Sequence, residues 1–384
     1  MTEPATIVFL HDKREISGGE TSLLVLWERL DRRRFRPCLA GSHDSPLAAA
    51  ARRIDVLVLP AEFPRLRRLC GVQAWSQFRS LERQVRPLKP GLLHGNTPAT
   101  NIAAAWLGWR LSCPAVWHER TLVMPDEWDV DRLLGFLPER ILCNSQAVAK
   151  RFKGPSRRVR IIYNGVPLDR FTPGAGGELV RRSLGLAPDD IAIGIVGNFS
   201  PIKRHELFFE AAARLADNSP ALRFLVVGGE VFTDNLGREA ALKAEVRRLG
   251  LMEQVRFLGV RTDMPAVLDA LDIVVSPCEA EACSRALLEA MASGTPVVAV
   301  NGGGNPELVL SDRTGLLCPP GDPAALADAI DRLCRDSALR TAMGRAARAR
   351  AETHFPIERQ VRETEEVYRG LLERSRPAHK SHAQ

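Results

Sequence analysis

The sequence predicts an α/β protein built from two doubly wound domains with parallel sheets. Short aliphatic runs alternate with longer helical patterns along the chain of 384 residues, as expected for strands covered by helices on both faces. A segment rich in Gly and Pro at 171–190 interrupts this alternation once. A chain of this length also exceeds one ordinary hydrophobic core. We therefore expect two sheets, each with its own core.

The first domain is expected to span residues 1–172. Its apolar runs are continuous rather than alternating, which is typical of parallel strands buried on both faces. These runs lie at 6–10, 36–41, 55–60, 91–96, 114–118, 140–145 and 159–165. Ten or more residues of helical pattern separate most of them, so consecutive strands should be parallel.

The second domain is expected to span 187–355, after a linker at 173–186. Its strand-like runs lie at 191–198, 223–229, 255–260, 272–277, 295–300 and 314–320. A long surface helix should follow over 356–374, beginning beside a proline, and leave 375–384 as a tail. Ligands of open α/β sheets bind at the carboxyl ends of strands, so a cleft between the two domains is the expected active site.

Composition limits the classes of function. Hydrophobic residues make up 45% and charged residues 26% of the chain, a globular composition. No run approaches the ~18–20 apolar residues that cross a bilayer, and "MTEPATIVFL" lacks the basic start of a secretory signal. A cytoplasmic location is expected. None of the eight cysteines forms CxxC and the histidines show no paired spacing, which favours reduced core cysteines over a metal site.

The net charge of +7 is unevenly distributed along the chain. Residues 1–172 hold 27 Lys and Arg against 17 Asp and Glu, whereas the remainder holds 26 against 29. This asymmetry predicts that the first domain meets an anionic partner, whether nucleic acid, a phosphate-bearing substrate or a membrane surface.

Residues 62–89 form a basic stretch with seven cations and two acids. Apolar side chains are interleaved with them, namely Phe63, Leu66, Leu69, Trp75, Phe78, Leu81 and Val85. Such a stretch suits an anionic membrane surface. An ordinary surface helix that packs its apolar face on the sheet fits equally well.

Two strand-to-helix turns could bind phosphate groups. Gly18 and Gly19 lie between the first strand and the next helical run, where the backbone can approach a ligand at a helix N-terminus; a plain tight turn is the alternative. In the second domain, Lys203 and Arg204 lie between the strand ending at Gly197 and the next helix. Two cations oppose the helix dipole there, which is favourable if a phosphate binds; solvated loop charges are the alternative.

The strongest unit is "DIVVSPCEAEACSRALLEAMASGTPVVAV", residues 272–300. Glu281 lies in the loop after a strand, and Glu289 lies in an otherwise apolar helix over about 284–293. A carboxylate pressed toward a core is costly unless it is paired or hydrogen-bonded. The hydroxyls of a ribose would satisfy Glu289; an i,i+4 ion pair with Arg285 is the alternative.

The E-x7-E spacing of Glu281 and Glu289, followed by "AMASGTPVVA", resembles the signature of glycosyltransferase family 4. Further motifs agree in order along nearly the whole chain: "SGGE" at 17–20, "CNSQAVAKRF" at 143–152, "VRIIYNGVPLDRFTP" at 159–173, "GNFSPIKRHEL" at 197–207, "VRFLGVRTDMPAVL" at 255–268, then "GGGNPELV" and "TGLLCPPGDPAALADAI". The resemblance implies the GT-B architecture, with two Rossmann-like domains facing a central cleft and a C-terminal helix that crosses back to the first domain.

The resemblance implies a retaining hexosyltransferase that uses a nucleoside diphosphate sugar, with UDP favoured over GDP. The acceptor hydroxyl would belong to a glycan or a lipid-linked acceptor, in the assembly of cell-surface polysaccharide or glycolipid. If the basic stretch 62–89 meets a membrane, the acceptor would be lipid-linked and the enzyme would be peripheral on the inner face of the membrane. No metal motif appears and no cofactor is expected beyond the nucleotide sugar, which is a co-substrate.

The resemblance also implies roles for individual residues of the second domain. Glu289 would bind the ribose, and Glu281 would hold the transferred sugar. Lys203 would neutralise the diphosphate leaving group. Backbone N–H groups that should assist Glu281 belong to Ala282, Cys283 and Ser284. The residues that should border the base are Val260 and Arg261.

In the first domain, the resemblance implies that His118, in "VWHER", faces the sugar and that Gly19 closes over the diphosphate. Two departures stand out. Asn198 lies where the family often has arginine, and Arg204 lies where it has a second glycine, so Arg204 is expected to supply the missing charge. The usual aromatic-glycine pair is Cys283-Ser284, so no sugar identity is carried over.

Because Glu281 and Glu289 are both assigned to donor hydroxyls, no carboxylate pair remains to act as a glycosidase-like nucleophile. Front-face displacement is the simpler mechanism, with Lys203 stabilising the leaving group. Two rival functions remain. One is a nucleotide-sugar 2-epimerase of the same architecture. The other is a nucleic-acid-binding protein, which the charge alone suggests, without a recognised binding motif or aromatic platform.

Overall fold

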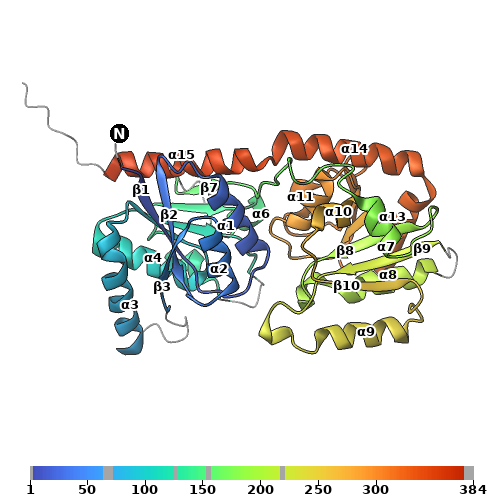
Figure 1. Ribbon diagram of the computed structural model, residues 1–384, viewed down its shortest axis with the longest axis horizontal. Helices are drawn as coiled ribbons and strands as arrows, with labels where there is room; N and C mark the ends of the chain where they lie inside the picture. Colours follow the sequence, from blue (N-terminus) through green and yellow to red (C-terminus); the bar gives the residue numbers. More distant parts are fainter. Residues whose placement is uncertain (1–2, 64–71, 124–127, 153–156, 217–220, 376–384) are drawn as a thin grey trace, which may run out of the picture. The chain divides into compact units, whose positions relative to one another are not determined.

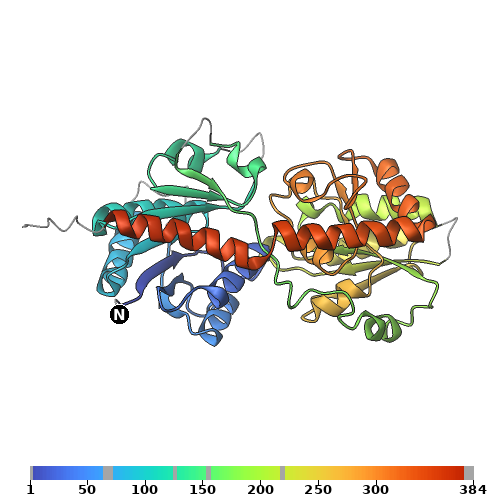
Figure 2. The ribbon, with the colours of Figure 1, turned by 90° about the horizontal axis from the view of Figure 1, so that it is seen from above.

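The computed structural model describes residues 3–63, 72–123, 128–152, 157–216 and 221–375. Its internal contacts divide the chain into two units. Unit 1 comprises Met1–Tyr163 and Glu358–Gln384, and unit 2 comprises Asn164–Ile357. Each unit is a parallel sheet with helices on both faces (Figures 1 and 2), which confirms the predicted α/β class.

The sheet of unit 1 has seven strands in the order β3-β2-β1-β4-β5-β6-β7, and all neighbours are parallel. The strands are β1 (Ala5–Leu10), β2 (Phe35–Gly41), β3 (Leu57–Pro60), β4 (Leu92–Gly95), β5 (Ala115–Glu119), β6 (Arg140–Cys143) and β7 (Val159–Ile161). Each overlaps one of the runs expected from the sequence. Because the order reverses between β1 and β4, the carboxyl ends of these strands form a topological switch point.

The described helices of unit 1 are α1 (Gly18–Arg29), α2 (Pro46–Arg53), α3 (Val72–Val85), the 3-10 turn η2 (Arg86–Leu88), α4 (Pro98–Leu111), α5 (Val130–Leu134), α6 (Gln146–Ala149) and α15 (Ile357–Ser375). Local sequence sets several of their starts. Ser45 caps α2, because its hydroxyl accepts the Ala48 N–H, and Ser145 caps α6 in the same way.

The C-terminal helix α15 packs on the sheet of unit 1. Tyr368 is fully buried and makes edge contacts with Phe9 of β1 and Phe35 of β2, at ring-centroid distances of 6.5 and 5.8 Å. Phe9 also contacts Trp27 of α1, at 5.3 Å. Aromatic rings in this arrangement bury large apolar areas with favourable edge-to-face geometry. The end of the chain is therefore part of the core of the first unit, as expected of the crossover helix.

The sheet of unit 2 has six parallel strands in the order β10-β9-β8-β11-β12-β13. They are β8 (Ile191–Val196), β9 (Leu222–Val227), β10 (Val255–Gly259), β11 (Ile273–Ser276), β12 (Val297–Val300) and β13 (Gly315–Cys318). The switch point lies between β8 and β11, the two strands whose following loops carry Lys203 and Glu281.

The helices of unit 2 are α7 (Gly177–Ser183), η3 (Pro201–Lys203), α8 (His205–Ala216), η4 (Thr233–Asn235), α9 (Arg238–Arg248), α10 (Met264–Asp269), α11 (Arg285–Ala292), α12 (Asn305–Leu308), α13 (Pro323–Arg335) and α14 (Ser337–His354). Helices α8, α9 and α13 cover one face, where Phe208 and Leu326 pack on strand residues such as Phe224. These apolar contacts form the core of the unit.

The expected linker at 173–186 contains helix α7. The carboxylate of Asp269 accepts hydrogen bonds from the backbone of Gly174 and Gly177, both at 2.7 Å, and so holds the start of α7 within unit 2. The chain divides at Tyr163/Asn164, earlier than the expected boundary at 172/173. The short helix was hidden because a Gly- and Pro-rich segment shows no apolar period.

The chain beyond the division is tied to the end of α14. Val166 N–H donates to the Phe355 carbonyl at 2.8 Å, and Ile357 N–H donates to the Val166 carbonyl at 3.1 Å. These hydrogen bonds explain why residues 164–172, which the sequence places in the first domain, belong to unit 2.

The basic stretch 62–89 lies partly outside the described residues. In its described part, the apolar face of α3 packs on the protein: Phe78, Leu81 and Val85 are buried. This is the behaviour of an ordinary surface helix, and it leaves Trp75, which is 55% exposed, as an apolar side chain at the surface. In the part of the chain that the structure describes, no helix is both long and apolar enough to cross a bilayer.

Candidate functional site

The switch point of unit 2 brings together a lysine and a carboxylate. Lys203, at the end of η3, and Glu281, in the loop after β11, lie 2.6 Å apart from Nζ to Oε2. Their side chains are 26% and 16% exposed. Burial disfavours the charged lysine, but the carboxylate outweighs it and raises the pKa of the Lys203 ammonium. The site thus holds a permanent cation at the carboxyl ends of two adjacent strands.

Arg204 adopts the left-handed conformation, with φ of +55°. This is the backbone geometry that glycine adopts readily, and it costs another residue about 1–2 kcal/mol. The conformation directs its guanidinium toward the β11 loop, where Nη2 lies 3.6 Å from Glu279 Oε1. Both cations of the turn therefore reach the same loop, and the pairing with Glu279 was not expected from the sequence.

Three backbone carbonyls hold the β11 loop in place. Gly304 N–H donates to the Glu281 carbonyl at 2.7 Å, and the Asn305 amide donates to Cys278 at 3.1 Å. The side-chain amide of Asn164 donates to the Cys283 carbonyl at 2.9 Å. Sequence reasoning gave these donors no role. The run of glycines in "GGGNPELV" was the available signal, since consecutive glycines permit close backbone approach.

The side chains of Cys283 and Ser284 face into the protein. The Cys283 side chain is buried, which raises the pKa of its thiol to about 12. The Ser284 hydroxyl accepts the Leu287 N–H at 3.3 Å and caps α11. The backbone N–H groups, rather than the side chains, are thus suited to bind a ligand at Ala282, Cys283 and Ser284. This explains how the usual aromatic-glycine pair can be replaced at these positions.

Glu289 is paired with Arg285. Their atoms Oε1 and Nη2 lie 2.6 Å apart, and the two side chains are 12% and 10% exposed. The i,i+4 pair that was the alternative interpretation therefore forms, although it is largely buried rather than on the surface. Arg285 Nη1 is buried without a hydrogen-bond partner in the described part of the chain. The pair thus holds a carboxylate in an otherwise apolar helix, next to a buried guanidinium N–H.

The remaining predicted residues of unit 2 lie in loops after β8 and β10. The Asn198 side chain accepts the Ser200 N–H at 3.1 Å and shapes the turn before η3. Val260 is 71% exposed, and Arg261 pairs with Asp263 at 2.6 Å. The loops after β8 and β9 touch closely, because a Cβ added at Gly228 would lie 1.8 Å from the Gly197 carbonyl oxygen.

In unit 1, Gly18 and Gly19 form the first turn of α1. The Glu20 carboxylate accepts the Ser17 N–H at 2.9 Å in a capping box. Burial would raise the pKa of Glu20, but contacts with His11 and Ser17 lower it to about 2. A Cβ at Gly19 would lie 4.0 Å from Arg120 Cδ, an ordinary van der Waals distance, so the described residues do not crowd this position.

His118 lies at the end of β5, in a group of buried polar side chains. Its Nδ1 is 3.2 Å from His94 Nε2 and 3.0 Å from Arg120 Nη2. Burial, followed by the charge of Arg120, lowers the pKa of both histidines well below the usual value. Arg120 also donates to the Gly19 carbonyl at 2.9 Å. Arg120 thereby connects two predicted site residues, and sequence reasoning missed it.

Glu119, the neighbour of His118, points to the other face of the sheet. Its carboxylate contacts Arg151 at 2.8 Å and accepts a 2.5 Å hydrogen bond from Asn101. Arg151 also pairs with Asp129 at 2.7 Å and lies 3.8 Å from Asp131. Burial, followed by the charge of Asp131, raises the pKa of Glu119 to about 8. Three carboxylates thus share one arginine.

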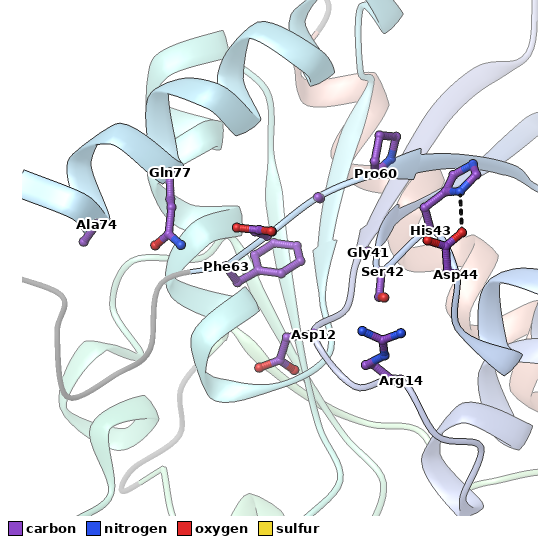
Figure 3. Close-up of a pocket in the computed structure, with 12 residues that line it drawn as sticks. Asp12, Arg14, Gly41, Ser42, His43, Asp44, Pro60, Phe63, Ala74 and Gln77 are labelled. Carbon is purple, nitrogen blue, oxygen red and sulfur yellow. Dashed lines mark hydrogen bonds and ion pairs between the residues drawn. The ribbon is translucent and has the colours of Figure 1, made fainter.

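A cavity of about 820 Å³ lies at the carboxyl ends of β1, β2 and β3, against α3. Figure 3 shows the ring of Phe63 between Gln77 and Arg14, with Asp12 nearby. The polar side chains that line it are Asp12, Arg14, Ser42, His43, Glu62 and Gln77. Such a combination of an aromatic face with hydrogen-bonding groups suits a polyhydroxylated ligand. The sequence did not reveal this cavity.

Within the residues that the structure covers, no three His, Cys, Asp or Glu side chains lie close enough together to hold a metal ion. The seven described cysteines are free, and five of them are buried. The groups suited to bind a ligand are instead the cations, carboxylates and backbone N–H groups at the two switch points.

Two Rossmann-like parallel sheets, each with polar side chains at its switch point, define an α/β protein of the GT-B class. Two family models match the chain: "Glycosyltransferase Family 4" over residues 16–170 and "Glycosyl transferases group 1" over residues 178–350. Together they span most of the sequence. The chain belongs to glycosyltransferase family 4.

Similar proteins agree with this assignment. D-inositol 3-phosphate glycosyltransferase of Salinispora arenicola is 35% identical over 244 residues, which cover 60% of this chain and 54% of that protein. The chain thus matches about half the length of that relative. HepE of Anabaena, solved with UDP-glucose, shares the fold at a TM-score of 0.84 and 23% identity, covering 95% of this chain and 99% of HepE. Sucrose-phosphate synthase of Thermosynechococcus elongatus has a TM-score of 0.78 at 20% identity, covering 96% and 100%.

Proposed function

We propose that this protein transfers a hexose from a nucleoside diphosphate sugar to an acceptor hydroxyl, with retention at the anomeric carbon and without a metal ion. The observation that carries the proposal is the Lys203–Glu281 contact at the switch point of unit 2. A cation at this place can stabilise a departing diphosphate, and the neighbouring carboxylate can accept hydrogen bonds from sugar hydroxyls.

The donor nucleotide is assigned to unit 2. Glu289 accepts the ribose hydroxyls while Arg285 holds its carboxylate, and Val260 and Arg261 border the base. Lys203 and Arg204 share the charge of the diphosphate, with the N–H groups of α11 near the sugar. UDP is the favoured nucleotide, because HepE, which shares the fold, was solved with UDP-glucose.

The chemical step is a front-face displacement. As the bond from the anomeric carbon to the diphosphate breaks, negative charge grows on the leaving oxygen and is stabilised by Lys203. The leaving diphosphate accepts the proton of the acceptor hydroxyl, whose oxygen forms the new bond on the same face. His118 hydrogen-bonds the sugar.

The acceptor is assigned to unit 1, in the cavity that contains Phe63. Its polar side chains and aromatic ring suit a glycan. Helices α3 and α4 bear the exposed rings of Trp75 and Trp109, each beneath an arginine, with Arg79 and Arg110 at 5.7 and 5.8 Å. Tryptophan and arginine together suit the interface of an anionic membrane, so we infer a lipid-linked acceptor on the inner membrane face.

The deciding experiment is a thermal-shift panel of nucleotides and nucleotide sugars on the full chain. A ligand at ~100 times its Kd should stabilise the protein by about 2.7 kcal/mol, and the stabilising nucleotide then serves as donor in a transfer assay with glycan and lipid-linked acceptors. Stabilisation by a nucleotide sugar with transfer to an acceptor supports the proposal. Consumption of the donor without any acceptor would instead indicate an epimerase, and no stabilisation by any nucleotide would refute the donor assignment.

A further inference from the structure

A chain of buried hydrogen-bonding groups in unit 1 runs from the C-terminal helix to the end of β5. Tyr368 Oη lies 2.5 Å from His94 Nδ1, and His94 Nε2 lies 3.2 Å from His118 Nδ1. Arg120 Nη2 lies 3.0 Å from the same His118 nitrogen. Tyr368 and His94 are 0% exposed and His118 is 2% exposed. Their proton positions are therefore set by one another rather than by water.

The contacts permit one arrangement of protons. A guanidinium can only donate, so His118 Nδ1 must accept from Arg120, and the ring proton of His118 must be on Nε2. His94 Nε2 faces the same lone pair and must therefore carry its own proton. This leaves His94 Nδ1 bare, which matches the Tyr368 hydroxyl that lies beside it. Every contact of the chain then joins a donor to an acceptor.

The arrangement keeps His118 neutral. A second proton on its ring would place an N–H group against the guanidinium of Arg120, and burial together with that charge lowers the pKa of His118 well below the usual value. His118 Nε2 is itself buried and has no hydrogen-bond partner within the described part of the chain. A buried donor without a partner is costly, so an oxygen of a ligand would improve its environment.

We propose that Tyr368, His94 and Arg120 are positioning residues that hold His118 as its Nε2–H tautomer, which donates a hydrogen bond to an oxygen of the sugar. The inference rests on the proposed function and deepens it, because it makes His118 a fixed hydrogen-bond donor and excludes it as a general base. A tyrosine of the last helix thereby sets the proton position at the end of β5. The logic resembles that of a catalytic triad, where a third group fixes the tautomer of a histidine.

The test reads the tautomer directly. Full-length protein with ¹⁵N-labelled histidine is studied by long-range ¹H–¹⁵N spectra at neutral pH, and the His118 signals are assigned by their loss in His118→Gln. We expect Nε2 protonated and Nδ1 bare in the wild type. Tyr368→Phe removes the hydroxyl that occupies His94 Nδ1, which should shift the balance of tautomers by about 10-fold. The kcat for sugar transfer should fall by roughly 10-fold, with the KM for the donor unchanged.

The matched control is Tyr163→Phe, which removes the hydroxyl of the other of the two tyrosines in the sequence. That hydroxyl lies 3.4 Å from Gln146 Nε2. It takes no part in the hydrogen bonds that join Tyr368 to His118, so the spectra and kcat of this variant should match those of the wild type. A His118 proton on Nδ1, or on both nitrogens, would overturn the inference. So would a Tyr368→Phe variant with unchanged tautomers and kcat. If the wild type transfers no sugar, the proposed function fails, while the same spectra still decide the proton arrangement.

Discussion

The Lys203 ammonium and the Glu281 carboxylate, 2.6 Å apart, join the two loops that follow β8 and β11. Each residue therefore has a structural partner as well as the chemical role assigned to it. A diphosphate that reaches Lys203 competes with Glu281 for the same cation. The strength of this ion pair should therefore influence two things. It should affect how the Glu281 carboxylate is oriented toward the sugar, and how tightly Lys203 binds the leaving diphosphate.

Lys203→Ala should lower kcat by about 10²–10³-fold, because one preorganised charge at the leaving group is lost. Glu281→Ala should lower it comparably, by removing the group that orients the sugar. Steady-state kinetics, with cooperative unfolding followed by circular dichroism, checks both. Lys243→Ala is the matched control, since this cation on α9 pairs with Glu239 at 2.6 Å and is 48% exposed. Turnover near the wild-type value in either site variant contradicts the assignment.

Arg204 allows the charge of a side chain to be separated from its backbone strain. Arg204→Gly and Arg204→Ala both remove the guanidinium, but only glycine relieves the left-handed φ of +55°. The glycine variant should be more stable than the alanine variant by about 1 kcal/mol in chemical unfolding. If Arg204 binds the diphosphate, both variants should raise the Kd of the nucleoside diphosphate by roughly 10-fold, the effect of losing about 1.4 kcal/mol. Equal stability of the two variants would argue against backbone strain, and unchanged affinity against the phosphate role.

Glu289→Gln should raise the KM for the donor while leaving kcat nearly unchanged. The amide keeps the size of the side chain but weakens its hydrogen bonds to two ribose hydroxyls, and about 1.4 kcal/mol of lost binding is a factor of ten. Glu363→Gln is the control, because Glu363 forms an i,i+4 pair with Arg359 on α15 that matches the Glu289–Arg285 pair. Calorimetric titration with the nucleotide measures the affinity of both variants, and only Glu289→Gln should bind more weakly than the wild type. A nucleotide affinity that is equal in both variants removes Glu289 from the ribose site.

Substitutions of His118 distinguish a hydrogen-bond donor from a base. The amide nitrogen of His118→Gln can occupy a place near Nε2 and donate, but an amide cannot take up a proton. We expect His118→Gln to keep kcat within about 10-fold of the wild type, whereas His118→Ala should lose about 10²-fold. Transfer rates of the two variants with a saturating donor provide the measurement. Equal, near-complete loss in both would favour a general base.

The sheets could be predicted from the sequence because parallel strands buried on both faces are continuous apolar runs. Every strand overlaps such a run. Lys203, Arg204 and Glu281 could be located because strand-to-helix turns mark the carboxyl edge of a sheet, and the pairing of Arg285 with Glu289 could be anticipated from their i,i+4 spacing.

The rest depends on contacts between distant parts of the chain. His94, His118 and Tyr368 come from β4, β5 and α15, and no local pattern links a tyrosine of the last helix to two strand ends. Arg120 could not be found from a local pattern either, because its role depends on contacts with both Gly19 and His118. Helix α7 was missed because its few apolar residues give no period. Tertiary packing, rather than propensity, decides these features.

The stability of unit 1 should fall as the pH rises from 7 to 8.5, because of Glu119. The pKa of Glu119 is raised from 4.5 to about 8 by burial and by Asp131, so the folded state holds a proton that the unfolded state has released. Its contribution is fully present below pH 4.5 and is lost as the pH passes about 8. The loss over this range should be about 1 kcal/mol. The buried cysteines of unit 1, Cys38, Cys113 and Cys143, whose pKa burial raises to about 12, add a smaller loss over the same range. The histidines of lowered pKa add a small gain just above pH 7, where their unfolded forms lose the last of their charge.

All six tryptophans lie in unit 1, so urea unfolding followed by tryptophan fluorescence reports on this unit. Glu119→Gln should remove the Glu119 part of the pH dependence, about 1 kcal/mol between pH 7 and 8.5, because the amide mimics the protonated carboxyl. Glu82→Gln is the matched control: Glu82 is also a buried carboxylate of unit 1, but its hydrogen bond with Arg86 lowers its pKa. Glu82→Gln should lose stability by the same amount at pH 7 and pH 8.5, since Glu82 stays ionised across this range. If Glu119→Gln instead keeps the pH slope of the wild type, the shared arginine holds Glu119 ionised, and the proton resides elsewhere in the cluster.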